Sequence, residues 1–224
     1  EAGCENNAYT SFDETVYYIN LPSNQLKLAL WLEASRMRDL DIDEIGIETQ
    51  RGVVTQERNV RYDNRPYSGW LDTMLVKLYP KGGVYSWPPI GDADHIAAAT
   101  KEEFQAFYDK FYVPSNAVLS ICGDINLEET RKIVADYFND LPNLPKPEFN
   151  EKAITSLKTS FKETKEDKFA TRPRIYTATL GPKFGEKDRY AVEILWNILF
   201  EGESSIFHKS LVEDEELAVF VSPL

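Results

Sequence analysis

Histidine and cysteine are scarce in this 224-residue sequence, and their scarcity excludes several kinds of site. Histidine occurs only as His95 and His208, and neither has a second histidine three or four residues away. The chain by itself therefore cannot supply two imidazole ligands to zinc from one helix. His95 is expected to be a capping or exposed residue, and His208 a partly buried or surface residue. The two cysteines, Cys4 and Cys122, fit either one disulfide or two separate thiols.

Other signatures are missing as well. The sequence contains no glycine-rich phosphate loop, no nucleophile elbow and no Cys-x-x-Cys pair. No apolar run approaches the ~20 residues that span a bilayer, so no membrane-spanning segment is predicted. The 37 acidic residues outnumber the 25 basic ones, which gives a net charge of −12 spread along the chain. Because phosphate binding requires a basic face, nucleic acid is not expected as a partner.

The segments that are present alternate between strand-like and helix-like patterns. Residues 8–21 are rich in β-branched and aromatic residues and predict a long strand or a hairpin, and residues 116–124 predict a buried strand. Thr100 and Glu103 predict a capping box at a helix start. Helices are predicted at residues 25–40, 43–62, 69–80, 101–112 and 127–141. Ser23 or Asn24 is the expected cap of the first of these.

A proline-rich segment, residues 142–152, predicts a linker that divides the chain. After it, strands are predicted at 154–166, 172–182 and the C-terminal run, and helices at 188–200 and within 204–216. This order is similar to the order before the linker and suggests a structural duplication. Both ends of the sequence read as interruptions of folded structure, so the chain is expected to be a piece of a longer protein.

The helix predicted at 43–62 carries a carboxylate in an unexpected place. On a period of 3.6 residues, one stripe of this helix comprises Gln50, Val53, Val54, Glu57 and Val60. If this apolar stripe is buried, the Glu57 carboxylate is costly unless it is paired or bound to a metal ion. An ion pair with Arg58 or Arg61 and a metal site are the two explanations that the residues leave open.

The order of six motifs resembles that of the pitrilysin/insulinase family of zinc metallopeptidases, which includes the mitochondrial processing peptidases. The motifs are "NAYTSFDETVYY", "LALWLEASRM", "QRGVVTQERNVRYDNRPY", "YSWPPIG", "FYVPSNAVLSICGD" and "YFNDLP", and together they cover nearly the whole chain. The bacterial members look closest. The resemblance implies an α+β fold of mixed, mainly antiparallel sheets with helices packed mainly on one face, arranged in repeat units. It also implies that residues 1–147 are the later part of one unit and that residues 148–224 begin the next.

The same resemblance assigns roles to particular residues. In the family, an H-x-x-E-H helix supplies two histidine ligands and the general base, and a glutamate on a later helix is the third zinc ligand. That ligand corresponds to Glu57 here. The H-x-x-E-H helix is expected upstream of Glu1, so this chain is predicted to hold no catalytic residue and to be inactive and zinc-free by itself. Gln50 stands where many members carry a further glutamate, and it is expected to support the metal site by hydrogen bonding. Bacterial members often carry glutamine there, so the change does not imply inactivity.

By the same resemblance, Asn7, Ala8 and Tyr9 lie on a strand edge that receives peptide substrate through backbone hydrogen bonds. Simple pairing within the sheet is the alternative for these residues. The complete protein is expected to be a zinc-dependent endopeptidase that cleaves peptides or unfolded segments. Cleavage is expected in an enclosed chamber formed with a second half or a homologous subunit. A non-catalytic homologue or partner subunit that binds peptide by strand addition is the alternative. Location in the bacterial periplasm is expected because bacterial members are often exported.

Overall fold

The computed structural model describes residues 3–79, 83–148 and 160–223. The chain separates into two compact units. The first comprises Glu1–Thr155 with Phe161–Ile175, and the second comprises Ser156–Ser160 with Tyr176–Leu224. In the described part of the chain, no helix is long and apolar enough to cross a membrane.

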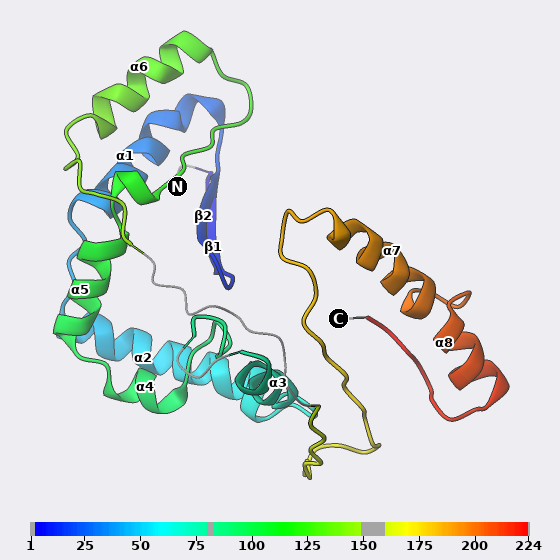
Figure 1. The fold of residues 1–224 in the computed structure, drawn as a ribbon. Coiled ribbons are helices and arrows are strands. Elements are labelled where there is room, and N and C mark those ends of the chain that lie inside the picture. The colour runs from blue at the N-terminus through cyan, green and yellow to red at the C-terminus, as the bar shows by residue number, and fades with distance from the viewer. Residues whose placement is uncertain (1–2, 80–82, 149–159, 224) are drawn as a thin grey trace. The chain divides into compact units, whose positions relative to one another are not determined.

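A β-hairpin opens the first unit, as predicted from residues 8–21. Strands β1 (Glu5–Thr10) and β2 (Thr15–Asn20) pair in antiparallel fashion, with Ala8 opposite Tyr17 (Figure 1). The Ser11 N–H donates to the Glu14 carbonyl across the turn at 2.8 Å. This two-stranded ladder is the sheet that the described residues form, and with the helices it confirms the α+β class.

Most helices of the first unit begin and end close to their predicted bounds. They are α1 (Leu26–Arg38), α2 (Glu44–Arg58), α3 (Trp70–Leu78), α4 (Ala93–Ala98), α5 (Lys101–Phe111) and α6 (Leu127–Phe138), with short 3-10 turns at Ser23–Gln25 and Pro114–Asn116 and a π-turn at Asn59–Asp63. Thr100 and Glu103 form the predicted capping box at the start of α5. The cap predicted for α1 is wrong, because Ser23 and Asn24 lie in the 3-10 turn and Gln25 precedes the helix without a side-chain cap. Helix α4 was not predicted, since it is short.

Helix α1 supplies the centre of the first unit's small core. Leu30 and Ala34 are buried one helical turn apart on α1, and α1 packs against α6. The Tyr108 hydroxyl of α5 donates to the Arg36 carbonyl at 2.8 Å. Burial of the phenol raises the pKa of Tyr108 above its ordinary value. These contacts hold α5 and α6 around α1.

Within the described residues, the strands predicted after the hairpin are not formed. Residues 117–122 belong to no ladder, and the same holds for the described residues of the predicted strands at 160–166, 172–182 and 217–223. The first part of the 154–166 prediction, and the end of the linker after residue 148, fall outside the described residues. A strand needs a neighbouring backbone with which to exchange hydrogen bonds, and the described residues offer none here. Strand-like composition alone therefore overpredicted the sheet.

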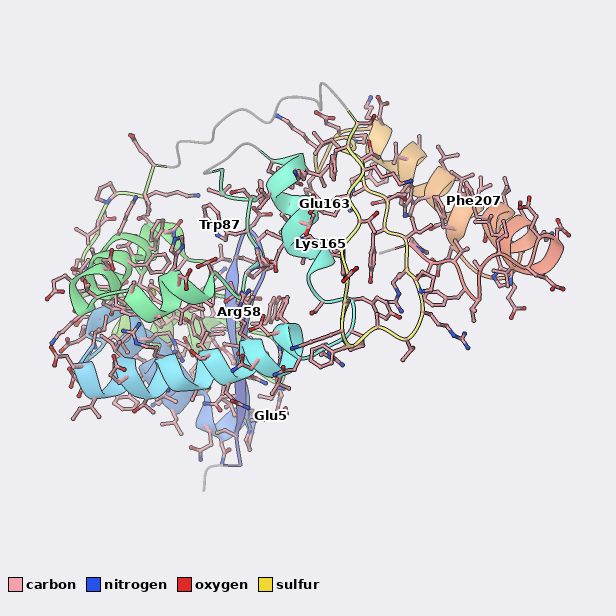
Figure 2. The ribbon with its side chains drawn as sticks, turned by 90° about the horizontal axis from the view of Figure 1, so that it is seen from below. Glu5, Arg58, Trp87, Glu163, Lys165 and Phe207 are labelled. Atoms are coloured by element: carbon pink, nitrogen blue, oxygen red, sulfur yellow. The ribbon has the colours of Figure 1, made fainter. Side chains whose placement is uncertain are left out.

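The segment Phe161–Ile175 belongs to the first unit and lies along α3. The Lys165 ammonium donates to the Thr73 hydroxyl at 2.6 Å, and the Glu163 carboxylate lies 3.7 Å from the Lys77 ammonium. Figure 2 labels Glu163 and Lys165 in this segment beside α3. The Tyr67 N–H donates to the Asp167 carboxylate at 2.6 Å, and the pKa of that carboxyl is lowered by this bond and those from Phe169 and Ala170. The chain after the linker thus returns to the α3 end of the unit.

The second unit contains α7 (Asp188–Phe200), the short α8 (Ile206–His208) and a π-turn (Lys209–Asp214). Ser205 caps α8 by accepting from the His208 N–H. The rings of Phe200 and Phe207 stack with centroids 4.8 Å apart, which ties α7 to α8. These elements agree with the helices predicted at 188–200 and within 204–216.

Candidate functional site

Helix α2 presents the predicted Gln50–Glu57 row on its surface. Asp43 caps the helix by accepting from the Gly46 N–H at 2.6 Å, so the register of α2 is fixed at its start. Gln50 and Glu57, seven residues apart, lie on one face of α2. The assumption that this stripe is buried is wrong for the chain as described. Gln50 is exposed, and Val53 and Val60 are 54% and 58% exposed.

Glu57 pairs with Arg61, one of the two partners that the sequence left open. The Arg61 Nη1 atom lies 3.0 Å from Glu57 Oε1, one helical turn away. The side chains are 68% exposed for Arg61 and 37% exposed for Glu57. Such an exposed pair is weak, about 0.3–0.5 kcal/mol, and does not block exchange of the carboxylate to another cation. Arg58, the other possible partner, contacts different groups.

One carboxylate does not make a metal site. Among the residues that the structure describes, no group of three or more His, Cys, Asp or Glu side chains could hold a metal ion. Glu57 fits the chemistry of a single zinc ligand, because it is an accessible carboxylate paired with an exposed arginine. Glu57 as metal ligand and Gln50 as its supporting residue stay predictions.

The two histidines lie as expected, one in each unit. His95 is exposed in the first turn of α4, where its N–H donates to the Asp92 carboxylate at 3.2 Å. His208 is half-buried in the second unit, with Nε2 at 3.8 Å from Glu213 Oε1. Cys4 and Cys122 are exposed, and within the described residues they are not joined to each other.

Strand β1 pairs with β2 along one of its edges. Because Ser11 and Glu14 bond across the turn, the alternation of an antiparallel ladder directs the backbone groups of Asn6, Ala8 and Thr10 away from β2. The Ala8 N–H is taken up by the Asn7 side-chain oxygen at 2.8 Å. Asn7, Ala8 and Tyr9 are all exposed, and their role in substrate binding stays a prediction. The structure refines it, since Ala8 rather than Asn7 or Tyr9 presents outward backbone groups.

Arg58, labelled in Figure 2, is the last residue of α2, and its contacts were not predicted from the sequence. Its Nε atom is 3.6 Å from the Asp63 carboxylate, and its Nη1 donates to the Gly91 carbonyl. Its positive charge also acts on Asp72 and Asp92. Burial raises the pKa of Asp72, and the Arg58 charge opposes this. The pKa of Asp92 is lowered, chiefly by the backbone N–H groups of His95 and Asp94.

Comparison with known families matches both parts of the chain. The family model described as the peptidase M16 inactive domain matches residues 98–222, and the one described as insulinase (peptidase family M16) matches residues 1–76. The chain therefore belongs to the peptidase M16 family. This confirms the pitrilysin/insulinase resemblance that the six motifs indicated.

Individual relatives agree with the family. The zinc protease PqqE of Helicobacter pylori is 33% identical over 229 residues, which cover 96% of this chain and 49% of that protein. The probable zinc protease PqqL of Escherichia coli is 29% identical over 150 residues, 62% of this chain and 15% of that protein. The crystal structure of a protease from Helicobacter pylori superposes with a TM-score of 0.72 and 27% identity over 97% of this chain and 53% of that one. The chain thus spans about half the length of this Helicobacter pylori protein.

Proposed function

We propose that this chain is part of a zinc-dependent endopeptidase and that Glu57 is one of the zinc ligands. The observation that carries the proposal is the exposed stripe of α2, in which an accessible carboxylate stands between two exposed valines, Val53 and Val60. An apolar stripe of this kind suits a packing partner, and a carboxylate within it suits a cation once the stripe is covered. The matching relatives PqqE and PqqL are zinc proteases by name.

In our proposal, the other zinc ligands and the general base are residues outside this sequence. The 224 residues contain no H-x-x-E-H motif, so the two histidine ligands and the general base must be supplied by another part of the complete protein. When bound, zinc would polarise a peptide carbonyl and lower the pKa of a water molecule. The contribution of this chain is the Glu57 carboxylate, with Gln50 seven residues before it as a neutral hydrogen-bonding group.

Peptide is the proposed substrate, bound as a strand beside β1. The outward N–H and C=O groups of Ala8 suit an extended backbone, and the Asn7 side chain that now accepts from Ala8 would turn away. Backbone recognition selects an extended conformation rather than a side-chain sequence, which fits peptides and unfolded segments. We propose an enclosed chamber completed by the other half of the protein or by a homologous subunit.

The second candidate function is a non-catalytic subunit that binds peptide by strand addition. The exposed edge of β1 supports a non-catalytic subunit as much as it supports an endopeptidase, because strand addition needs no metal. The two candidates differ at Glu57, which only the peptidase requires. As location we propose the periplasm, supported by the crystal structure of the first half of the periplasmic protease PqqL from Escherichia coli, which superposes on 67% of this chain and 32% of that one with a TM-score of 0.59 and 23% identity.

Zinc analysis of the complete protein tests the proposal. One zinc per molecule is expected, with loss of the metal in Glu57→Gln because a neutral amide is a poor ligand beside two imidazoles. Glu128→Gln, an exposed carboxylate paired with Arg131, is the matched control and should keep its zinc. Full zinc in Glu57→Gln would refute the ligand role, and a zinc-free complete protein would favour the non-catalytic subunit.

The chain of 224 residues is expected to have no peptidase activity by itself. It holds one of three expected ligands and lacks the general base. Stoichiometric zinc in the purified chain, together with chelator-sensitive cleavage of an unfolded peptide, would contradict this expectation.

A further inference from the structure

A second row of residues runs along α2 beside the Gln50–Glu57 row. Arg51 and Arg58 are also seven residues apart, and each follows a member of the first row directly. Successive residues of a helix are turned by about 100°, so the two arginines face a different neighbour from Gln50 and Glu57. Their side chains are only 18% and 15% exposed, whereas Arg61 on the outer face is 68% exposed.

The two arginines hold the two ends of helix α4. Arg51 donates from Nη1 to the Ile96 carbonyl and from Nη2 to the Ala99 carbonyl at 2.9 Å. These carbonyls lie at the C-terminal end of α4, where backbone acceptors lack helical partners and a cation is favourable. Arg58 donates to the Gly91 carbonyl, directly before the Asp92 cap of α4. Helix α2 packs against α4, and Figure 1 shows the two helices side by side.

The acceptors of these hydrogen bonds are backbone carbonyls, and this constrains the orientation of α2. A backbone carbonyl cannot follow an arginine by changing rotamer, so the two bonded ends fix the rotation of α2 about its own axis. Gly91 has a φ of +80°, a left-handed conformation that sets the direction of its carbonyl. The Arg58 side chain is 15% exposed and lies 3.6 Å from the Asp63 carboxylate, and within the described residues its Nε atom has no hydrogen-bond partner.

We propose that Arg51 and Arg58 are positioning residues that set the direction of the Glu57 carboxylate by fixing the rotation of α2. This inference rests on the proposed function, because it requires Glu57 to be a metal ligand. A small rotation of α2 would swing every side chain of the outer row, and metal sites tolerate little displacement of a ligand. Loss of a group bonded directly to a metal ligand weakens metal binding by roughly 10–100-fold, and because Arg51 and Arg58 bond to backbone carbonyls at the two ends of α4 instead, we expect an effect at the lower end of that range.

A double-mutant cycle on zinc affinity in the complete protein tests the inference. Zinc dissociation constants are measured by chelator competition for wild type, Arg58→Ala, Glu57→Asp and the double variant, with unfolding midpoints for all four proteins. Glu57→Asp keeps a carboxylate but shortens it, so a weakened zinc affinity stays measurable. Arg58→Ala should weaken zinc binding roughly 10-fold in the wild type and much less in the Glu57→Asp background, because its effect passes through the position of the Glu57 carboxylate. A merely structural loss would be the same in both backgrounds.

Three further variants test the positioning role of the two arginines. Arg51→Ala acts at the other end of α4 and should weaken zinc binding similarly, which covers the case that Arg58→Ala does not fold. Arg58→Lys, which keeps the charge and one donor, should restore part of the affinity. Arg131→Ala, an exposed arginine of α6, is the control and should leave zinc affinity unchanged.

The measured zinc affinities distinguish the positioning role from the proposed function. If Glu57→Gln removes zinc but neither Arg51→Ala nor Arg58→Ala weakens it beyond twofold, the positioning role is refuted and the proposed function stands. Equal losses in both backgrounds refute it as well. If Glu57→Gln leaves zinc binding intact, the ligand assignment fails and the positioning role fails with it.

Discussion

The substitution Glu57→Gln in this chain tests whether Glu57 and Arg61 form an exposed helix pair or a buried ion pair. The wild-type carboxylate lies 3.0 Å from Arg61 one turn later, and both side chains are more than one-third exposed. Double-mutant measurements of such i,i+4 pairs give about 0.3–0.5 kcal/mol, which is the expected loss. A negative charge near the C-terminal end of a helix costs a few tenths of a kcal/mol, and the substitution removes that cost. Glu and Gln have nearly the same helix propensity, so no third effect intervenes.

The free energy of unfolding should therefore change by less than about 0.5 kcal/mol in either direction. With an m-value of at least about 1 kcal/mol/M in urea, the unfolding midpoint should move by less than about 0.5 M. Because the chain has two units, the probe must report on the first unit alone. Trp31, Trp70 and Trp87 lie in that unit, so tryptophan fluorescence in a Trp196→Phe background meets this need.

Glu128→Gln, which breaks the exposed pair with Arg131 on α6, is the matched control and should give a similarly small change. A loss of more than about 2 kcal/mol on Glu57→Gln, with the control unchanged, would refute the reasoning. Glu57 would then be a buried ion-pair partner, and its carboxylate would be committed to folding rather than accessible to a cation.

Three further outcomes are expected. Gln50→Ala in the complete protein should weaken zinc binding or activity by roughly 10–100-fold, and a change within twofold on both measures would make Gln50 an ordinary surface residue. Asp92 has a lowered pKa, so its charge stabilises the folded state above the ordinary value of 3.8 and this contribution is lost as the pH falls through the folded pKa. The advantage of wild type over Asp92→Asn in urea midpoint should therefore narrow from about pH 6 to about pH 3, and an unchanged difference would contradict the shift. Thr100→Ala should cost about 1 kcal/mol by removing half of the capping box, with Thr100→Ser restoring most of it.

Local signals predicted the helices well. Capping at Asp43, Thr100 and Asn126 is decided by residues within one turn, and α2, α5 and α6 begin where those residues are. Helix α4 escaped prediction because six residues give little periodicity, although the Asp92 cap that starts it was visible in the sequence.

Non-local contacts could not be predicted. Residues 117–122 have the composition of a strand, but whether they join a sheet depends on a partner that local sequence does not specify. The return of Phe161–Ile175 to α3 depends on contacts such as Lys77 with Glu163, which are far apart in the chain. The arginine row was equally hidden, since Arg51 and Arg58 look like solvent-exposed charges until α4 is placed beside them.

A metal at Glu57 was predicted for a covered stripe, and in the described chain the stripe is exposed. With Val53 and Val60 more than half exposed, the carboxylate is hydrated and needs no cation for stability in this chain. The same valines make the stripe a poor permanent surface, because apolar side chains that flank one helix face suit a packing partner. Once a partner covers them, water is removed from Glu57 too, and an exposed pair with Arg61 no longer suffices to balance its charge. If Glu57 is a zinc ligand as we propose, covering the stripe and binding the cation are coupled, and zinc binding should appear together with the protection of α2.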